Sequence, residues 1–314
     1  MTNIRSKKTQ SINQLKKTTT KRTITTKTSK SANTHTTSKK FLSTMTQDMQ
    51  TYLAKPNGVF QEADYFLSLH KPNSNIDDHT SIISPWHHIP LVASSSGNHQ
   101  PSFNFVCEIA KGTTAKFEID TKTPNNPIKQ DIKKGQLRHF KYGNLPFNYG
   151  ALPQTWEDPK HIDPIMKLGG DNDPLDVVEI SDNALQHGGV YPVKILGALA
   201  LIDEGEVDWK LIAINTAHPL ADSIHTTTDL NTHLPEFENS LVDWFKNYKT
   251  AEGKGQNEFG FEGKLLDKLK AHEIIQQCHD SWLNLSKGVK SGVIETSLAV
   301  APLEEGFQRA ELKF

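Results

Sequence analysis

The chain has 314 residues, a hydrophobic fraction of 35% and a formal net charge of −1. That fraction is high enough for a folded core, which excludes a fully disordered protein. The longest apolar stretch, residues 195–202 interrupted only by Gly197, is far shorter than the ~18 residues of a membrane-spanning helix, so we expect no membrane insertion. Two cysteines, Cys107 and Cys278, allow at most one disulfide, which excludes a disulfide-built scaffold and indicates a reducing compartment.

The near-neutral charge conceals two regions of opposite sign. Residues 1–47 contain 11 Lys and Arg, 20 Ser and Thr and no acid, which leaves 24 bases and 36 acids for residues 48–314. The leader has too few large apolar residues to offset the entropy of ordering, so we predict that it is disordered. Its composition is also typical of an organelle transit peptide, which favours a mitochondrial protein; a solvated tail on a cytoplasmic protein is the alternative. The acidic body should attract cations rather than nucleic acid.

Hydrophobic patterning predicts strands first and helices later. Polar loops are expected at 71–85 and 91–101, and strands at 103–109, 115–119, 193–202 and 209–214. Gly197 predicts a bend or bulge in the third strand. Apolar residues repeat at helical spacing only within 237–248 and 275–285, and the tail from about Gly288 is expected to be loosely held. This order predicts an α+β, mainly β fold: a β-barrel with helices packed outside.

The densest group of acids is the hexapeptide 171–176, Asp-Asn-Asp-Pro-Leu-Asp. Its three carboxylates repel one another unless a cation neutralises them, and oxygen ligands favour a hard ion such as Mg²⁺ over zinc. An EF-hand loop starting at Asp171 is excluded, because it would place Asp176 where glycine and Asp182 where glutamate is required. An ordinary solvated turn is the remaining alternative.

A second acidic segment, residues 203–210 (Asp-Glu-Gly-Glu-Val-Asp-Trp-Lys), lies between two predicted strands. It is either a charged hairpin loop or a second source of metal ligands, since two acidic turns at strand ends can converge over one barrel mouth. Lys116, Arg138, Tyr248 and Lys249 add the cationic and phenolic groups that hold polyphosphate together with Mg²⁺. Singly, such lysines are more often only solubilising.

Together these motifs resemble the family I soluble inorganic pyrophosphatases of the eukaryotic type. The resemblance runs from about residue 86 to about residue 285 and includes 148–159, 170–176 and 203–210. It implies a five-stranded OB-like barrel with flanking helices in a domain of residues 48–314. It further implies Mg²⁺-dependent hydrolysis of inorganic diphosphate to two phosphates, and a homodimer.

The resemblance also implies residue roles. The metal and water shell would consist of Asp171, Asp176, Asp208, Asp203, Glu108 and Glu118. Asp176 would bridge two metals, and Asp173 would help to deprotonate the water between them. Phosphate contacts would come from Lys116, Arg138, Tyr149, Lys210, Tyr248 and Lys249. Arg138 and Lys210 would stabilise charge on the leaving phosphate.

Some positions depart from the family pattern. Leu145 stands where the family often has tyrosine, the segment 139–147 is shortened, and Glu108 is followed by Ile-Ala-Lys-Gly. No residue of the metal cluster is missing. Two other functions stay open: a pyrophosphatase-like interaction subunit of a nuclear complex, with the basic leader on nucleic acid, and a nucleotide pyrophosphohydrolase, for which we find no nucleoside pocket in the sequence.

Overall fold

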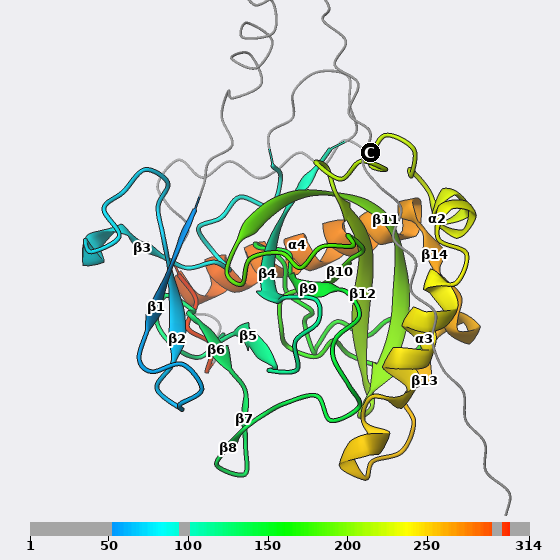
Figure 1. Ribbon diagram of the computed structural model, residues 1–314, viewed down its shortest axis with the longest axis horizontal. Coiled ribbons are helices and arrows are strands. Elements are labelled where there is room, and N and C mark those ends of the chain that lie inside the picture. Colours follow the sequence, from blue (N-terminus) through cyan, green and yellow to red (C-terminus); the bar gives the residue numbers. More distant parts are fainter. Residues whose placement is uncertain (1–51, 94–100, 291–296, 302–314) are drawn as a thin grey trace, which may run out of the picture. The chain divides into compact units, whose positions relative to one another are not determined.

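The structure, a computed structural model, describes residues 52–93, 101–290 and 297–301 (Figure 1). The predicted disordered leader, residues 1–47, lies outside them. Strands precede residue 216 almost without interruption and the longer helices follow it. The described chain is therefore mainly β with few helices, as the sequence pattern predicts.

A long antiparallel hairpin forms the centre of the fold. Strands β11 (Val190–Asp203) and β12 (Glu206–Asn215) are joined by the two-residue turn Glu204-Gly205. Both turn residues have positive φ (51° and 93°), the conformation that two-residue hairpin turns require. The β11–β12 register shifts between Ile195 and Gly197, which confirms the predicted bulge.

Three shorter strands extend this hairpin into a sheet: β4 (Phe103–Ile109), β9 (Asn148–Ala151) and β10 (Asp176–Glu179). β12 pairs with β10, β10 with β9, β9 with β4, and β4 with β11. Because β11 also pairs with β12, the pairing returns to its starting strand. The short strands β13 (Glu258–Phe259) and β14 (Leu266–Asp267) pair with β11 as well.

A second sheet holds the N-terminal part of the described chain. Its strands are β1 (Leu53–Asn57), β2 (Phe66–His70), β3 (Ile82–Ile83), β5 (Phe117–Ile119) and β6 (Ile128–Gln130), and β7 (Ile132–Lys133) and β8 (Gln136–Leu137) form a separate small hairpin. The expectation of an irregular loop over 71–85 is wrong at its end, because a 3₁₀ turn (His79–Ser81) leads into β3. These strands are too short for periodicity to reveal them.

Among the described residues, three α-helices follow the long hairpin: α2 (Thr227–His233), α3 (Phe237–Asn247) and α4 (Lys268–Lys290). The two predicted helices are confirmed, whereas α2 was not predicted, since Leu230 is its single buried residue. The expectation of a loose tail from Gly288 is wrong where the chain is described, because Leu298 is buried and the Ala299 N–H donates to the Thr121 carbonyl. No helix among the described residues is both long and apolar enough to cross a bilayer.

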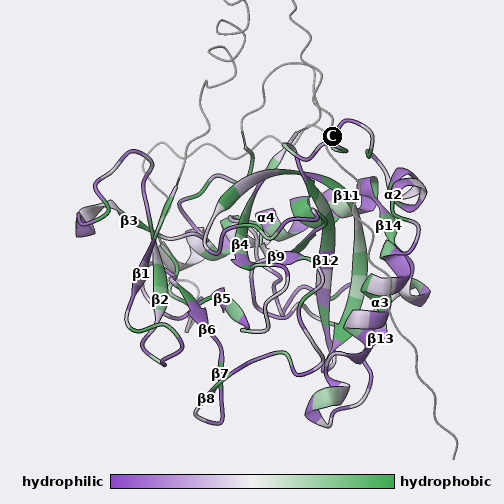
Figure 2. Ribbon diagram, in the orientation of Figure 1, coloured by the Kyte–Doolittle hydropathy of each residue, from purple (hydrophilic) through white to green (hydrophobic). Residues whose placement is uncertain are grey.

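Hydrophobic colouring concentrates along β11 and β12 (Figure 2). Both faces of this hairpin are covered, so its apolar run is nearly continuous. On β12, Ile212 and Ile214 belong to one buried cluster and Leu211 and Ala213 to the other. The two-residue period of a strand then places Asp208 on the Ile212 face, near the start of β12. This alternation aims the polar residues of β12 at the site described next.

Candidate active site

A cavity of about 270 Å³ is lined by every residue to which the sequence analysis gave a role. The acids among them are Glu108, Glu118, Asp171, Asp173, Asp176, Asp203 and Asp208. The other groups are Lys116, Arg138, Tyr149, Lys210, Tyr248 and Lys249. Residues separated by more than 100 positions in the sequence thus share one hollow.

The two acidic segments converge because their backbones pair. Gly170 forms a parallel bridge with Val207, and the Val207 N–H donates to the Gly169 carbonyl at 2.8 Å. Six residues further on, Asp176 opens β10 opposite Lys210 in the parallel register of β10 and β12. The predicted convergence of the two segments is confirmed. The segment 203–210 is a hairpin and also a source of carboxylates, so both interpretations of it hold.

Three acids, Glu157, Asp171 and Asp208, each bring one carboxylate oxygen within 4.8 Å of the other two. Burial raises the pKa of Asp208 to about 7. Burial, together with the neighbouring acids, also raises the pKa values of Asp171 and Glu157 well above their usual range. Three buried carboxylates are unfavourable in their charged form unless a cation neutralises them. Because the group contains only oxygen ligands and no thiolate or imidazole, it fits a hard divalent cation. Asp171 and Asp208 were predicted as ligands; Glu157 was not.

Lys210 is the cation that balances two of the acids. Its side chain is only 3% exposed, and its ammonium contacts the carboxylates of Asp176 and Asp208. Asp176 also accepts a hydrogen bond from the Tyr149 hydroxyl. Burial alone would lower the pKa of Lys210, but the two carboxylates raise it well above its ordinary value. The two carboxylates therefore stabilise the charged ammonium.

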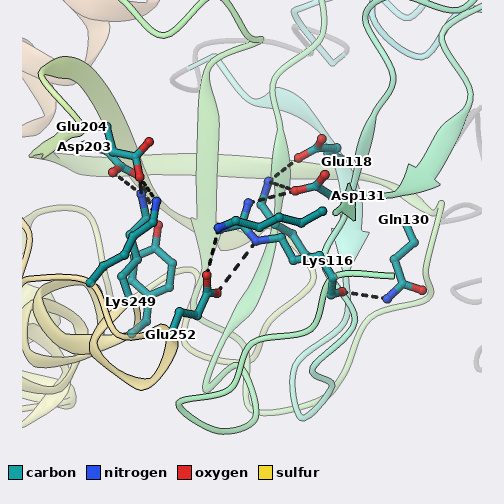
Figure 3. A network of polar contacts seen from close by, with 12 residues as sticks. Lys116, Glu118, Gln130, Asp131, Asp203, Glu204, Lys249 and Glu252 are labelled. Carbon is teal, nitrogen blue, oxygen red and sulfur yellow. Dashed lines mark hydrogen bonds and ion pairs between the residues drawn. The ribbon is translucent and has the colours of Figure 1, made fainter. Parts of the chain in front are cut away.

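A second set of charges lies on the β5–β8 side of the cavity, where Figure 3 shows Lys116, Glu118 and Asp131 together. The Lys116 ammonium contacts Glu118 and lies 3.7 Å from Asp131. Asp131 also accepts from the Arg138 guanidinium at 2.8 Å. Backbone hydrogen bonds from the N–H groups of Lys116 and Arg138 fix this arrangement, which holds two cations toward one hollow.

A third set faces it across the cavity (Figure 3). The Lys249 ammonium contacts Asp203, and the Tyr248 hydroxyl donates to the same carboxylate at 3.2 Å. Lys249 and Tyr248 follow directly after α3, and Asp203 ends β11. The hairpin turn and the end of the helix are thus joined by charge. Burial raises the pKa of Tyr248, which keeps the phenol protonated as a donor.

Glu108 and Asp173 occupy contrasting positions. Glu108 is buried, and its Oε1 accepts from the Ile119 N–H at 2.7 Å, which ties β4 to β5. Asp173 is open to solvent at the cavity rim. Desolvation within the cavity, with a contribution from Glu118, raises the pKa of its carboxyl to about 7. A group with this pKa can accept a proton near neutrality.

The inorganic pyrophosphatase family model matches residues 105–283, more than half of the chain. The chain belongs to the inorganic pyrophosphatase family. It is 44% identical over 230 residues to the human inorganic pyrophosphatase, covering 71% of this chain and 78% of that protein. It is 44% identical over 216 residues to soluble inorganic pyrophosphatase 1, chloroplastic, of Chlamydomonas reinhardtii, covering 69% and 75%. The crystal structure of the type I inorganic pyrophosphatase from Toxoplasma gondii superposes with a TM-score of 0.70 at 38% identity, covering 74% of this chain and 99% of that one.

Leu145, one of the departures from the family pattern, lies in the wall of the cavity. It is only 1% exposed and is held by backbone hydrogen bonds with Gly112 and Thr113. Its apolar side chain offers no proton donor or acceptor there. Any proton transfer in this member of the pyrophosphatase family must therefore use the remaining groups.

Two acids that the sequence analysis did not single out complete the charges around Arg138. Asp131 is described above, and Glu252 lies 3.9 Å from the Arg138 Nε and 3.1 Å from Lys133. Neither acid belongs to a recognisable motif, so only the fold brings them to the cavity. Glu157 did carry a signal: it belongs, together with Asp158, to the Trp-Glu-Asp-Pro segment of residues 156–159, which lies within the stretch 148–159 that resembles the family.

Proposed function

We propose that this chain hydrolyses inorganic diphosphate to two phosphates in a reaction that depends on Mg²⁺. One observation carries the proposal: acids, lysines, an arginine and tyrosines from separate sequence motifs line a single cavity of about 270 Å³. Catalysis of phosphoryl transfer consists mainly of positioning and charge neutralisation. An assembly of carboxylates and fixed cations supplies both.

The carboxylates and the rim acid have distinct tasks in this proposal. Bound Mg²⁺ would neutralise phosphate charge and acidify the attacking water. Asp171, Asp176 and Asp208 would hold the cations, with Asp203, Glu108 and Glu118 completing the shell. Asp173 would orient the water and accept its proton, since its pKa of about 7 suits that exchange near neutral pH.

The cations of the cavity would bind the two phosphoryl groups. Arg138 can present two N–H groups to one phosphate, and Lys116 lies beside it through their shared partner Asp131. Lys249 and Tyr248 approach from the α3 side. Lys210, with Tyr149 beside it, would stabilise charge on the leaving phosphate once the metal takes over Asp176 and Asp208.

Phosphate release from diphosphate, measured beside release from ATP, tests the proposal against its alternatives. Rapid release from diphosphate alone is expected; EDTA should abolish it and added Mg²⁺ restore it. Equal release from ATP would instead favour the nucleotide pyrophosphohydrolase, for which the cavity offers aromatic walls at Phe140, Trp244 and Phe245. No release from either substrate would favour a non-enzymatic interaction subunit.

Several finer features belong to the same proposal. The closed circuit of strand pairings supports the five-stranded OB-like barrel. The chloroplastic relative supports an organellar form, and we propose the mitochondrion, with residues 1–47 as a removable leader and 48–314 as the enzyme domain. Activity of a chain starting at residue 48, the location of a tagged full chain, and light scattering for the homodimer test these points.

A further inference from the structure

Glu157 is a buried acid with two oxygens in different environments. The residue is 2% exposed. Its Oε1 accepts a hydrogen bond from the Trp209 N–H at 3.0 Å. Its Oε2 is buried and has no hydrogen-bond partner among the described residues. A buried carboxylate oxygen without a partner requires an explanation, because desolvation without compensation is costly.

The backbone of Glu157 is fixed to the acidic hexapeptide. Its N–H donates to the Asp173 carbonyl at 3.0 Å, and its own carbonyl accepts from the Asn172 N–H at 2.9 Å. Its side chain meanwhile binds the β12 backbone at Trp209, between Asp208 and Lys210. Glu157 therefore connects the two segments that carry Asp171 and Asp208.

The two segments approach each other most closely where Gly170 lies against the backbone of Glu157. A Cβ on Gly170 would lie 2.5 Å from the carbonyl carbon and oxygen of Glu157. Only glycine permits this contact, which holds the carboxylates of Glu157, Asp171 and Asp208 within 4.8 Å of one another. Three acids held at this distance by backbone pairing form a built set of oxygen donors.

We propose that Glu157 is a further residue of the metal centre: its free carboxylate oxygen faces the cation held by Asp171 and Asp208 and contributes to its affinity. Oε1 fixes β12, and Oε2 adds a third negative oxygen to the two aspartates. This inference rests on the proposed function, because it presumes the Mg²⁺ site of that reaction. It adds a carboxylate that none of the predicted ligand positions includes.

A purely structural role is the alternative. Glu157 also borders a cavity of about 20 Å³ that has room for one water molecule. If Oε2 bound only that water, Glu157 would support the backbone of β12 and have no influence on the cation. The two roles differ in what happens to metal affinity when the charge is removed and the shape kept.

Calorimetric titration of the full chain with Mg²⁺ alone, before and after Glu157→Gln, tests the proposal. The glutamine oxygen can still accept from Trp209, so the fold should be retained, which thermal unfolding in EDTA checks. Loss of a group that supports a metal site typically weakens binding 10–100-fold. We therefore expect Mg²⁺ affinity to fall by about that factor, and the rise in melting temperature on adding Mg²⁺ to shrink. The matched control is Asp158→Asn, the adjacent acid, whose Oδ1 accepts from the Lys160 N–H and which is absent from the acid group.

The outcomes separate this inference from the proposed function. An active wild type whose Mg²⁺ affinity is unchanged by Glu157→Gln would overturn the role of Glu157 and leave the function standing. A wild type that binds Mg²⁺ but does not hydrolyse diphosphate would reject the function instead. If both Glu157→Gln and Asp158→Asn weakened binding equally, a general charge effect would replace the specific contact, and the inference would fail. If Glu157→Gln proves unstable in EDTA, Glu157→Asp tests the contact from the other side, because it keeps the charge but shortens the reach: weaker Mg²⁺ binding would support the contact with the cation, and unchanged binding would overturn it.

Discussion

Replacing Lys210 with methionine should make the stability of this protein strongly dependent on Mg²⁺. The Lys210 ammonium is the shared partner of Asp176 and Asp208, and its side chain is 3% exposed. Methionine fills a similar volume without the charge. In the absence of metal it leaves two facing carboxylates with no cation between them.

The size of the effect follows from the contacts that are lost. Breaking a buried ion pair by removing one partner costs about 3–5 kcal/mol. Lys210 also lies 5.4 Å from the Tyr149 ring and 5.7 Å from the Phe245 ring, contacts worth about 0.5–2 kcal/mol. Mg²⁺ can replace the ammonium beside the carboxylates but cannot replace the ring contacts. We expect Lys210→Met to lose about 3–5 kcal/mol in EDTA and no more than about 2 kcal/mol in saturating Mg²⁺.

Equilibrium urea unfolding in EDTA and in Mg²⁺ measures both quantities. Lys194→Met is the control, since the Lys194 ammonium contacts the Ala221 carbonyl and the His225 ring, and its stability loss should be the same in both buffers. An equal loss for Lys210→Met with and without Mg²⁺ would refute the reasoning, because the lysine would then act through packing alone.

Three further predictions concern the acids and the glycine that packs against Glu157. Asp173→Asn should lower kcat by about 10²–10⁴-fold, the usual contribution of a general base, while calorimetry finds Mg²⁺ affinity nearly unchanged; phosphate release close to the wild-type rate would reject its role. Gly170→Ala, whose Cβ meets Glu157 at 2.5 Å, should cost about 1–3 kcal/mol of stability and weaken Mg²⁺ binding, whereas Gly255→Ala, with open space around it, should do neither. Without metal, the free energy of unfolding should fall as the pH rises from about 4 to about 7. The reason is that the pKa of Asp208 is 3.8 in the unfolded chain and about 7 in the folded one, so over this range the folded state keeps a proton that the unfolded state has lost. The decrease should be on the order of 4 kcal/mol. Mg²⁺ should flatten this slope in unfolding experiments across the pH range, and a pH-independent metal-free protein would contradict the burial of Asp208.

Hydrophobic patterning predicted those parts of the fold in which many consecutive turns or residues of one element are buried. The apolar run of β11 and the helical spacing of α4 each report burial over many residues, so both were found. The short strands β9 and β10 were not, since four residues with mixed polarity carry no usable period. Their positions are fixed by pairing with β12 and β4, which is information about partners distant in the sequence.

The site was predictable to the extent that its chemistry is concentrated in short motifs. Three acids within six residues already indicate a cation site, because their mutual repulsion is local and does not depend on distant partners. Asp131 and Glu252 carry no such local signal. They are single acids whose significance depends on Arg138. Asp131 meets Arg138 when the β7–β8 hairpin between them forms, and Glu252 meets it only when the turn after α3 comes alongside. Glu157 lies between these cases: its motif marks it as unusual, but its proximity to Asp171 and Asp208 follows from the backbone hydrogen bonds of Asp173 and Trp209. A buried charged residue can therefore be identified from the sequence only when its partners are near it in the sequence. Where an acid and the cation that balances it lie on different strands, the pair is recognised only in the folded structure.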